Sequence, residues 1–427
     1  MLTPEENDLL TRVEGDAPMG RMMRRYWIAA CLTEEIPEPD CDPVRVRLFG
    51  EDLVAFRDSE GRVGLIDEAC PHRRASLFYG RNEECGLRCL YHGWKIDVEG
   101  NVTDMPSEPA NSEFAGKVKQ KAYPVKEWGG FIWTYMGEAE HMPEFVPPHF
   151  APTENTNVST FKVHVDCNWA QGLEGAIDSA HSSSLHSTDM PPASVGRSTA
   201  TGTSWQRPST DKAPRLVVQS TNYGFQYAAV RRPIRNSDSH DYVRLTHFIA
   251  PHHVAIPPND VYNVAQMNVP VDDTHHNLYI IAWSETGGVD QEVWRKFTGM
   301  QLGIDLDPEY KKIKKRGDNY GQDRAAMRVG KNFTGIKGFP NQDIAMWETM
   351  MPVAERWREK LGASDLAVVE FRSRMVEAIK AFVAGAAPPQ LDSNQRTSVR
   401  AFEGIVPKST DWRTLGGAEQ TRDAAAE

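Results

Sequence analysis

The chain has 427 residues, and its hydrophobic, aromatic and charged fractions of 40%, 9% and 25% are those of a globular protein, which excludes general disorder and a fibrous repeat. A formal net charge of -11 argues against a nucleic-acid partner, because phosphate binding needs a basic surface. At this length we expect two domains, each with a core of its own.

The beginning of the chain, MLTPEENDLL, lacks the basic and apolar regions of a secretory signal. The longest apolar stretches, such as residues 278–283, are too short to span a membrane. Six cysteines in so long a chain do not resemble a disulfide framework, and close cysteine–histidine pairs in a reducing compartment more often bind metal. We therefore expect a soluble, cytoplasmic protein without a membrane partner.

The first third of the chain predicts a small antiparallel β domain, because apolar, β-prone stretches alternate with turn residues. The expected elements are a short helix at residues 19–27 and strands at residues 44–48, 53–56, 63–66, 94–102 and 130–135. A proline-dense stretch follows, and proline interrupts both helices and ladders. We therefore expect one domain over residues 1–150 and a second over residues 151–427.

The second domain is expected to be α+β. Strands are predicted at residues 215–231, 242–249 and 278–283, and helical segments at residues 168–186 and 341–384. In the last segment apolar residues recur at helical spacing until Gly385, which predicts a long C-terminal helix.

Two mixed cysteine–histidine pairs lie in the predicted β domain. Cys70 and His72 are followed after sixteen residues by Cys89 and His92. In a Rieske centre two thiolates hold one iron and two neutral imidazoles hold the other, so each loop must contribute one ligand of each kind. A zinc site could use the same four residues, but one residue between cysteine and histidine is an uncommon zinc spacing. We predict a 2Fe–2S cluster, with Cys85 as a free thiol nearby.

A second group of potential ligands follows the domain boundary. Asp178 and His181 share one face of a regular helix, whereas His181 and His186 point about 140° apart at ~100° per residue. Both histidines can bind one metal only if the helix bends or ends, for which the serines at residues 182–184 are suitable. Two histidines and one carboxylate are the ligand set of iron(II) oxygenases. The carboxylate stays open among Glu174, Asp178, Asp343 and Asp365.

Neighbouring histidines also occur at residues 252–253 and 275–276. Adjacent side chains on a strand point to opposite faces, so neither pair is expected to chelate a metal by itself. We expect these histidines to be surface or core residues.

With both constellations in this order, the sequence resembles the ring-hydroxylating oxygenases of the Rieske type, in particular the phthalate dioxygenase-like family of α-only terminal oxygenases. The resemblance rests on Arg25-Tyr26-Trp27, Cys70-Pro71-His72-Arg73, the stretch from Cys89 to Trp94, the spacing of Asp178, His181 and His186, and Gln342-Asp343. It implies an all-β Rieske domain followed by a helix-grip (START/Bet v1-like) catalytic domain with an antiparallel sheet and a long C-terminal helix.

The resemblance also implies roles for individual residues. His181, His186 and Asp343 would hold one mononuclear iron(II) per subunit, with Asp343 at the start of the C-terminal helix. Asp178 would bridge an iron ligand to a cluster histidine, His72 or His92, of the next subunit. The implied assembly is a head-to-tail homotrimer, which could stack as a hexamer.

The implied substrates are dioxygen and an aromatic carboxylate such as phthalate, isophthalate or a chlorobenzoate, held by Arg207 and Arg244. A guanidinium fork suits a carboxylate. The expected product is a cis-dihydrodiol. The alternatives are a monooxygenase or O-demethylase of a methoxybenzoate such as vanillate, or an electron-transfer module without oxygenase activity. No flavin or nicotinamide fingerprint is visible in the sequence, so electrons from NADH would arrive through a separate FMN and 2Fe–2S reductase.

Overall fold

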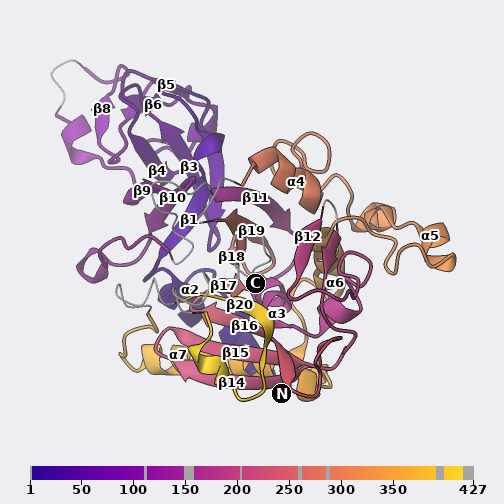
Figure 1. The fold of residues 1–427 in the computed structure, drawn as a ribbon. Coiled ribbons are helices and arrows are strands. Elements are labelled where there is room, and N and C mark those ends of the chain that lie inside the picture. Colours follow the sequence, from indigo (N-terminus) through magenta and orange to yellow (C-terminus); the bar gives the residue numbers. More distant parts are fainter. Residues whose placement is uncertain are drawn as a thin grey trace. The chain divides into compact units, whose positions relative to one another are not determined.

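The computed structural model describes residues 2–109, 113–148, 158–201, 204–257, 262–284, 289–390 and 399–416 (Figure 1). The chain forms two compact units. The smaller unit comprises Arg12–Pro147 and Pro270–Asp273, and the larger comprises Met1–Thr11, Pro148–Val269 and Thr274–Glu427. The predicted boundary between residues 150 and 151 lies outside the described residues.

The smaller unit is built from three small antiparallel sheets. They are β1 (Trp27–Leu32), β10 (Phe131–Tyr135) and β9 (Val125–Trp128); β2 (Val44–Leu48), β3 (Glu51–Arg57) and β4 (Val63–Asp67); and β5 (Arg81–Glu83), β6 (Gly86–Arg88), β7 (Lys95–Ile96) and β8 (Val102–Asp104). Helix α2 (Pro18–Met23) precedes them. Phe56, Ile66 and Trp94 are buried in one core cluster together with Cys70 and Cys89. The two cysteines are thus fixed by the packing of the strands around them.

The larger unit contains one eight-stranded antiparallel sheet in the order β11-β19-β18-β17-β16-β15-β14, with β20 also paired to β16. Its strands are β11 (Val158–Val165), β14 (Arg215–Thr221), β15 (Gly224–Arg231), β16 (His240–Ile249), β17 (His253–Ile256), β18 (Asn263–Pro270), β19 (His276–Trp283) and β20 (Phe402–Pro407). A separate hairpin is formed by β12 (Thr199–Thr201) and β13 (Ser204–Gln206). Nearly every side chain of β16 and β19 is buried, as in strands that are covered on both faces.

Six helices are described in the larger unit: α1 (Pro4–Thr11), α3 (Trp169–Ile177), α4 (Gln291–Thr298), α5 (Arg324–Arg328), α6 (Phe339–Thr349) and α7 (Leu366–Val383). Figure 1 shows α7 lying along β14 and β15. Phe371 of α7 makes edge-to-face contacts with Trp169 of α3 and Phe248 of β16. This ring links the C-terminal helix, the sheet and the helix that leads to the predicted iron ligands. The helix-grip architecture implied by the sequence is confirmed.

Two of the helical segments predicted from the sequence are shorter than expected. The segment at residues 341–384 is divided into α6 and α7 by an irregular stretch that contains Pro352, and Met351 has a φ of 80°. Proline removes a helix hydrogen bond, and a positive φ breaks the helical path. Asp343 therefore lies in α6, and the expectation that it begins the C-terminal helix was wrong.

The segment at residues 168–186 also ends early, because Asp178 at the end of α3 has an extended backbone. Its carboxylate accepts hydrogen bonds from the backbone N–H groups of Ala180 and His181, which turns the chain away from the helix. A short 3₁₀ turn at His181–Ser183 follows. The predicted departure from helix near the serines is present, but it begins one turn earlier, at Asp178.

In the smaller unit the helix predicted at residues 19–27 stops at Met23, and Trp27 already starts β1. The strand predicted at residues 94–102 is two short strands, β7 and β8, joined by a turn. None of the described helices is both long enough and apolar enough to cross a membrane.

Candidate functional site

The two predicted cluster loops have the same local geometry. In the first, the backbone N–H of Arg74 donates to the carbonyl of Cys70 at 2.9 Å, and in the second Gly93 donates to Cys89 at 2.9 Å. Both residues that close these turns have positive φ, 62° at Arg74 and 77° at Gly93. At the second position a Cβ atom would lie only 2.6 Å from Pro106, so glycine is required there. Each loop therefore presents a cysteine and a histidine from one tight turn.

The four predicted cluster ligands meet at one end of the smaller unit's core. Cys70 and Cys89 are buried, and the rings of His72 and His92 lie 4.4 Å apart. His72 is also stacked on Trp94, with 4.4 Å between ring centroids and planes 9° apart. The histidines are partly exposed at the surface, whereas the thiols lie beneath them. This division by residue type matches a cluster with one thiolate-bound and one imidazole-bound iron.

The side chains of these residues also fit a metal cluster chemically. The Nδ1 atom of His72 is buried and has no hydrogen-bond partner among the described residues, so its burial is uncompensated unless it binds a metal. Burial, together with the nearby Cys89 thiol, raises the pKa of Cys70 to about 11, against the opposing effect of the backbone N–H groups of His72 and Arg73. Such a thiol ionises at neutral pH only when a metal stabilises the thiolate. Cys85 lies apart, in the turn between β5 and β6.

The structure brings His181, His186 and Asp343 together, although sequence spacing alone left the carboxylate open. The Nε2 atoms of the two histidines are 3.1 Å apart, and Oδ1 of Asp343 lies 3.5 Å from His181 and 3.1 Å from His186. Three ligand atoms this close to one another can share one ion. The early end of α3 makes this possible, because the irregular turn after it rotates His186 toward His181.

Each histidine of this triad is oriented through its other ring nitrogen. Nδ1 of His181 lies 3.4 Å from the carboxylate of Asp178, and Nδ1 of His186 lies 2.7 Å from Oε1 of Gln342. The amide of Gln342 is held in turn by Asp189. Metal-binding histidines characteristically have such partners, which fix the ring and leave Nε2 to the ion.

Electrostatics keep Asp178 ionised. Burial alone would raise its pKa, but the hydrogen bond with His181, the charge of that histidine and the backbone N–H groups of Ala180 and His181 together lower it. An ionised carboxylate is the form that accepts a hydrogen bond from the N–H group of an imidazole. The partner of Asp178 in a neighbouring subunit stays a prediction.

Two other carboxylates that the sequence left open have different roles. Glu174 is buried in ion pairs with Arg356 at 2.8 Å and Arg372 at 2.7 Å, and so ties α3 to the C-terminal segments. Asp365 accepts a hydrogen bond from the backbone N–H of Gly362, just before α7. Neither lies in the histidine group.

A small cavity of about 90 Å³ opens on the triad. Its walls are mostly apolar and include Ile256, Val264 and Trp347, whereas Arg244 provides a cation. Apolar walls with few fixed polar groups are typical of a site for a small aromatic ligand. A larger cavity of about 640 Å³ shares the wall residues Met190, Trp205 and Phe339 with it.

The two predicted substrate arginines are placed differently. Arg244 lies on β16 and lines the cavity. Arg207 is not a lining residue, but its guanidinium donates to the hydroxyl groups of Ser182 at 3.4 Å and Ser183 at 3.2 Å, and Ser182 lines the cavity. Arg207 is buried, and its Nε has no partner among the described residues.

A third buried arginine, Arg231, was missed from the sequence. It donates to the carbonyl of Ser179 at 2.6 Å and to its hydroxyl at 3.2 Å, next to Asp178. Burial, with smaller contributions from the charges of Arg244 and Arg207, lowers the pKa of Arg231 to about 10. A sequence signal for Arg231 existed. Arg231 ends one predicted strand and Tyr242 begins the next, so pairing of the two strands as a hairpin brings Arg231 close to Arg244.

These arginines sit beside one anionic group on the neighbouring strand. Glu403 of β20 is the cross-strand partner of Arg244, and its carboxylate accepts a short hydrogen bond from Tyr242. Burial would lower the pKa of Arg244, but Glu403 and Tyr242 keep it raised. Three guanidinium groups thus lie beside this one glutamate, whereas the carboxylates of Asp178 and Asp343 line the cavity at the histidines.

Comparison with protein families gives two matches. A Rieske 2Fe–2S domain model matches residues 26–124, and a model described as LigXa C-terminal domain-like matches residues 134–427. The first range includes all four predicted cluster ligands, and the second includes His181, His186 and Asp343.

Curated proteins similar to this chain include the phthalate 4,5-dioxygenase oxygenase subunit of Pseudomonas putida, which is 61% identical over 97% of this chain and 94% of that protein. The 3-chlorobenzoate-3,4-dioxygenase oxygenase subunit of Comamonas testosteroni is 36% identical over 97% of this chain and 98% of that protein.

Solved structures with the same fold are much more distant in sequence. Pseudomonas putida CBB5 NdmA, as a QL mutant with caffeine, has a TM-score of 0.61 at 16% identity, covering 92% of this chain and 99% of that chain. Dicamba monooxygenase bound to dicamba has a TM-score of 0.56 at 18% identity, with 85% and 99% coverage.

Proposed function

Since this chain belongs to the Rieske-type aromatic ring-hydroxylating oxygenases, as a terminal oxygenase component, we propose that its substrate is an aromatic dicarboxylate of the phthalate type. The observation that supports this proposal is the position of Arg244 in the same cavity as His181, His186 and Asp343. Two further buried arginines, Arg207 and Arg231, add to the positive charge. A dianion would be attracted to these cations.

The metal ligands belong to this proposal. The cluster is held by Cys70, His72, Cys89 and His92. The mononuclear iron is held by His181, His186 and Asp343, and their mutual distances of 3.1–3.5 Å suit one ion. When bound, the cluster supplies electrons singly and the iron activates dioxygen.

The chain's own residues position the reactants. Gln342 and Asp178 orient the iron-binding histidines, so that both Nε2 atoms face the same point. Arg244 fixes one substrate carboxylate by a forked, charge-assisted hydrogen bond, which sets the ring's orientation. Apolar residues such as Val264 and Trp347 pack against the ring and exclude water.

The chain needs partners for turnover. Electrons come from a separate reductase, which we propose oxidises NADH through FMN and its own 2Fe–2S cluster. We further propose a head-to-tail homotrimer in which Asp178 links His181 to a cluster histidine of the next subunit. This assembly is supported by the exposure of Asp178, whose side chain remains 25% exposed although both of its oxygen atoms have partners in its own subunit.

A turnover screen with the holoenzyme and a phthalate-dioxygenase-type reductase tests the substrate proposal. We expect the dicarboxylates phthalate and isophthalate to be consumed faster than 3-chlorobenzoate, benzoate and vanillate, because single carboxylates leave the arginines partly unpaired. Mass analysis after reaction under isotopically labelled dioxygen should find both labelled oxygen atoms in the product. One labelled atom, or loss of a methyl group from vanillate at a higher rate, would favour the monooxygenase or O-demethylase alternative.

A matched pair of variants tests the role of Arg244. Arg244→Lys keeps the charge but loses the forked geometry, and Arg244→Ala loses both. We expect kcat/KM for phthalate to fall by at least about tenfold in the alanine variant, the effect of losing a charged hydrogen bond of about 1.5 kcal/mol. Equal kcat/KM in the alanine variant and the wild type would refute the clamp.

A further inference from the structure

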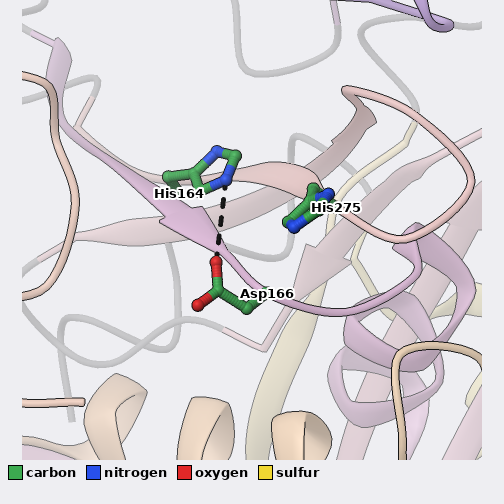
Figure 2. A group of neighbouring side chains, drawn as sticks. All are labelled: His164, Asp166 and His275. Carbon is green, nitrogen blue, oxygen red and sulfur yellow. Dashed lines mark ion pairs between the residues drawn. The ribbon is translucent and has the colours of Figure 1, made fainter. Parts of the chain in front are cut away.

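A second group of two histidines and one carboxylate lies in the larger unit, away from the triad. His164 and Asp166 are two residues apart at the end of β11, so their side chains share one face of the strand. The register pairs His164 with Asn277 and Val165 with His276, which brings Asp166 opposite His275. Asp166 and His275 directly adjoin the paired residues of β11 and β19, and Figure 2 shows the three side chains near one another.

This group was not predicted from the sequence, because only histidines adjacent in the chain were assessed as metal-binding pairs. His276 does point the other way, as expected: it is buried, and its Nδ1 lies 2.8 Å from the carbonyl of Cys167. His275 instead meets a histidine that is more than one hundred residues away in the chain. A cross-strand contact of this kind depends on the register of the sheet.

The three side chains are close enough to share one ion after a small adjustment. Nε2 of His164 lies 3.7 Å from Oδ1 of Asp166, and one ligand atom from each of the three residues falls within 4.8 Å of the others. The two imidazole rings are 5.3 Å apart and nearly parallel, at 20°. Figure 2 shows a nitrogen of His275 directed toward the space beside the other two residues. Asp166 is 64% exposed, so its carboxylate is free to move by the remaining distance.

The ring of His275 is oriented by its neighbour in the chain. Nδ1 of His275 lies 3.0 Å from the hydroxyl of Thr274, and such a partner helps to fix the orientation of an imidazole ring.

One nearby charge opposes a cation, but it is offset. Lys311 is close enough to act on His164 electrostatically. Its ammonium group is paired with Glu309 at 2.6 Å, which reduces its effect on the group. Mg²⁺ and Ca²⁺ prefer oxygen ligands throughout, whereas imidazole with carboxylate suits later first-row ions.

We propose that His164, Asp166 and His275 form a surface site for a late first-row divalent cation such as Zn²⁺, separate from the mononuclear iron site. The bound ion would join the end of β11 to the residue that precedes β19. Water would complete its coordination on the exposed side of Asp166. This proposal does not depend on the substrate of the enzyme.

The site lies in a segment that leads directly to the iron ligands. The backbone N–H of Asp166 donates to the carboxylate of Glu348 at 3.2 Å, and Glu348 belongs to α6, the helix that carries Asp343. Asn168, two residues on, caps the first turn of α3. An ion that fixes Asp166 would therefore stabilise the fold around both segments, and the melting temperature should rise when Zn²⁺ binds.

Calorimetric titration of Zn²⁺ into the iron-loaded holoenzyme tests the proposal. We expect one zinc equivalent to bind without loss of iron, and the affinity to fall by more than about tenfold in His164→Ala and in His275→Ala. His240→Ala, which removes a partly exposed histidine from β16, should bind Zn²⁺ as the wild type does. Mg²⁺ in excess should not compete.

The exposed Asp166 supplies a variant with little risk to folding. Asp166→Asn should weaken Zn²⁺ binding and remove the zinc-dependent rise in melting temperature, while its melting temperature in a chelator stays that of the wild type. If wild type, His164→Ala and Asp166→Asn bind Zn²⁺ equally, or if zinc binds only as iron is released, the proposed site does not exist.

Discussion

Single residues carry the electrostatic character of the catalytic unit. Arg207, Arg231 and Arg244 are all buried, and burial lowers the pKa of Arg207 and Arg231, with the charge of Arg244 acting in the same direction on both. Arg231 is connected to the iron site through its hydrogen bonds to Ser179, the residue after Asp178. Arg231 can therefore act on the substrate through its charge and on the turn at Asp178 and Ser179 through its hydrogen bonds.

Substitution of Arg231 separates these effects. In Arg231→Ala we expect KM for phthalate to rise by at least about tenfold, because a buried cation and two hydrogen bonds are lost. In Arg231→Lys the rise in KM should be smaller, because the positive charge is kept. The control is Arg232→Ala, which removes the exposed neighbouring arginine and should leave steady-state kinetics unchanged. An unchanged KM in Arg231→Ala would show that its charge does not reach the substrate.

Asp178 is a positioning residue at the same scale. Asp178→Asn preserves the shape but removes the charge, so we expect slower reoxidation of the reduced cluster by substrate and dioxygen, by about tenfold or more. Iron content and the EPR spectrum of the reduced cluster should match the wild type. Stopped-flow absorbance of the cluster provides the measurement, and a wild-type rate in the variant would remove Asp178 from the electron path.

Individual elements join the active site to the core. Helix α3 is anchored on one side by Trp169, which contacts Phe371 of α7, and on another by Glu174, which pairs with Arg356 and Arg372. The sequence identified the helical regions, since hydrophobic periodicity is a local signal. It did not predict where α3 ends or that α6 and α7 are separate, because caps and backbone hydrogen bonds depend on neighbours in space.

The Glu174 pairs make the stability of α3 dependent on pH. Burial would raise the pKa of Glu174, but the charges and hydrogen bonds of Arg356 and Arg372 lower it below 4.5. A carboxyl group whose pKa is lowered by folding stabilises the protein above its unfolded pKa, and this contribution is lost as the pH falls through the folded pKa. Both arginines are almost fully buried, so they would be left without a partner if Glu174 were removed.

We therefore expect Glu174→Gln to destabilise the larger unit at pH 7 by about 3–5 kcal/mol, as for a broken buried ion pair. The difference from wild type should shrink as the pH falls below 4.5, the ordinary value for glutamate. Thermal unfolding followed by circular dichroism measures both. Glu370→Gln is the control, since its pair with Arg374 on α7 is partly exposed and worth about 0–1 kcal/mol. If Glu174→Gln lost as much stability below pH 4.5 as at pH 7, the link between the ionisation of Glu174 and stability would be contradicted.

The whole molecule combines two units with different metal chemistry in one chain. The smaller holds the Rieske domain and the larger the mononuclear site. If the proposed trimer is correct, a cluster serves the iron of another subunit. Two inactive variants, one without a cluster and one without iron, should then complement each other.

Co-expression of His72→Ala with His181→Ala tests this proposal. Random mixing in a head-to-tail ring pairs an intact cluster with an intact neighbouring iron site in about a quarter of cases, so we expect about a quarter of wild-type activity. Each variant alone should be inactive while forming the same assembly by light scattering. Absence of activity in verified mixed assemblies would mean that electrons pass within one chain.

The sequence by itself determined the cluster chemistry, the histidine pair and the fold class, because ligand types, short spacings and hydrophobic periods are local properties of the chain. Spacing left open which carboxylate joins His181 and His186, and the family resemblance implied Asp343, which the tertiary structure places beside them. The tertiary structure alone decided how Arg231 joins the other arginines and that His164 meets His275. Each of these contacts unites residues far apart in the chain, and their distances depend on strand register and on where helices end. Short-range patterns therefore predicted the chemistry, whereas long-range packing determined the geometry.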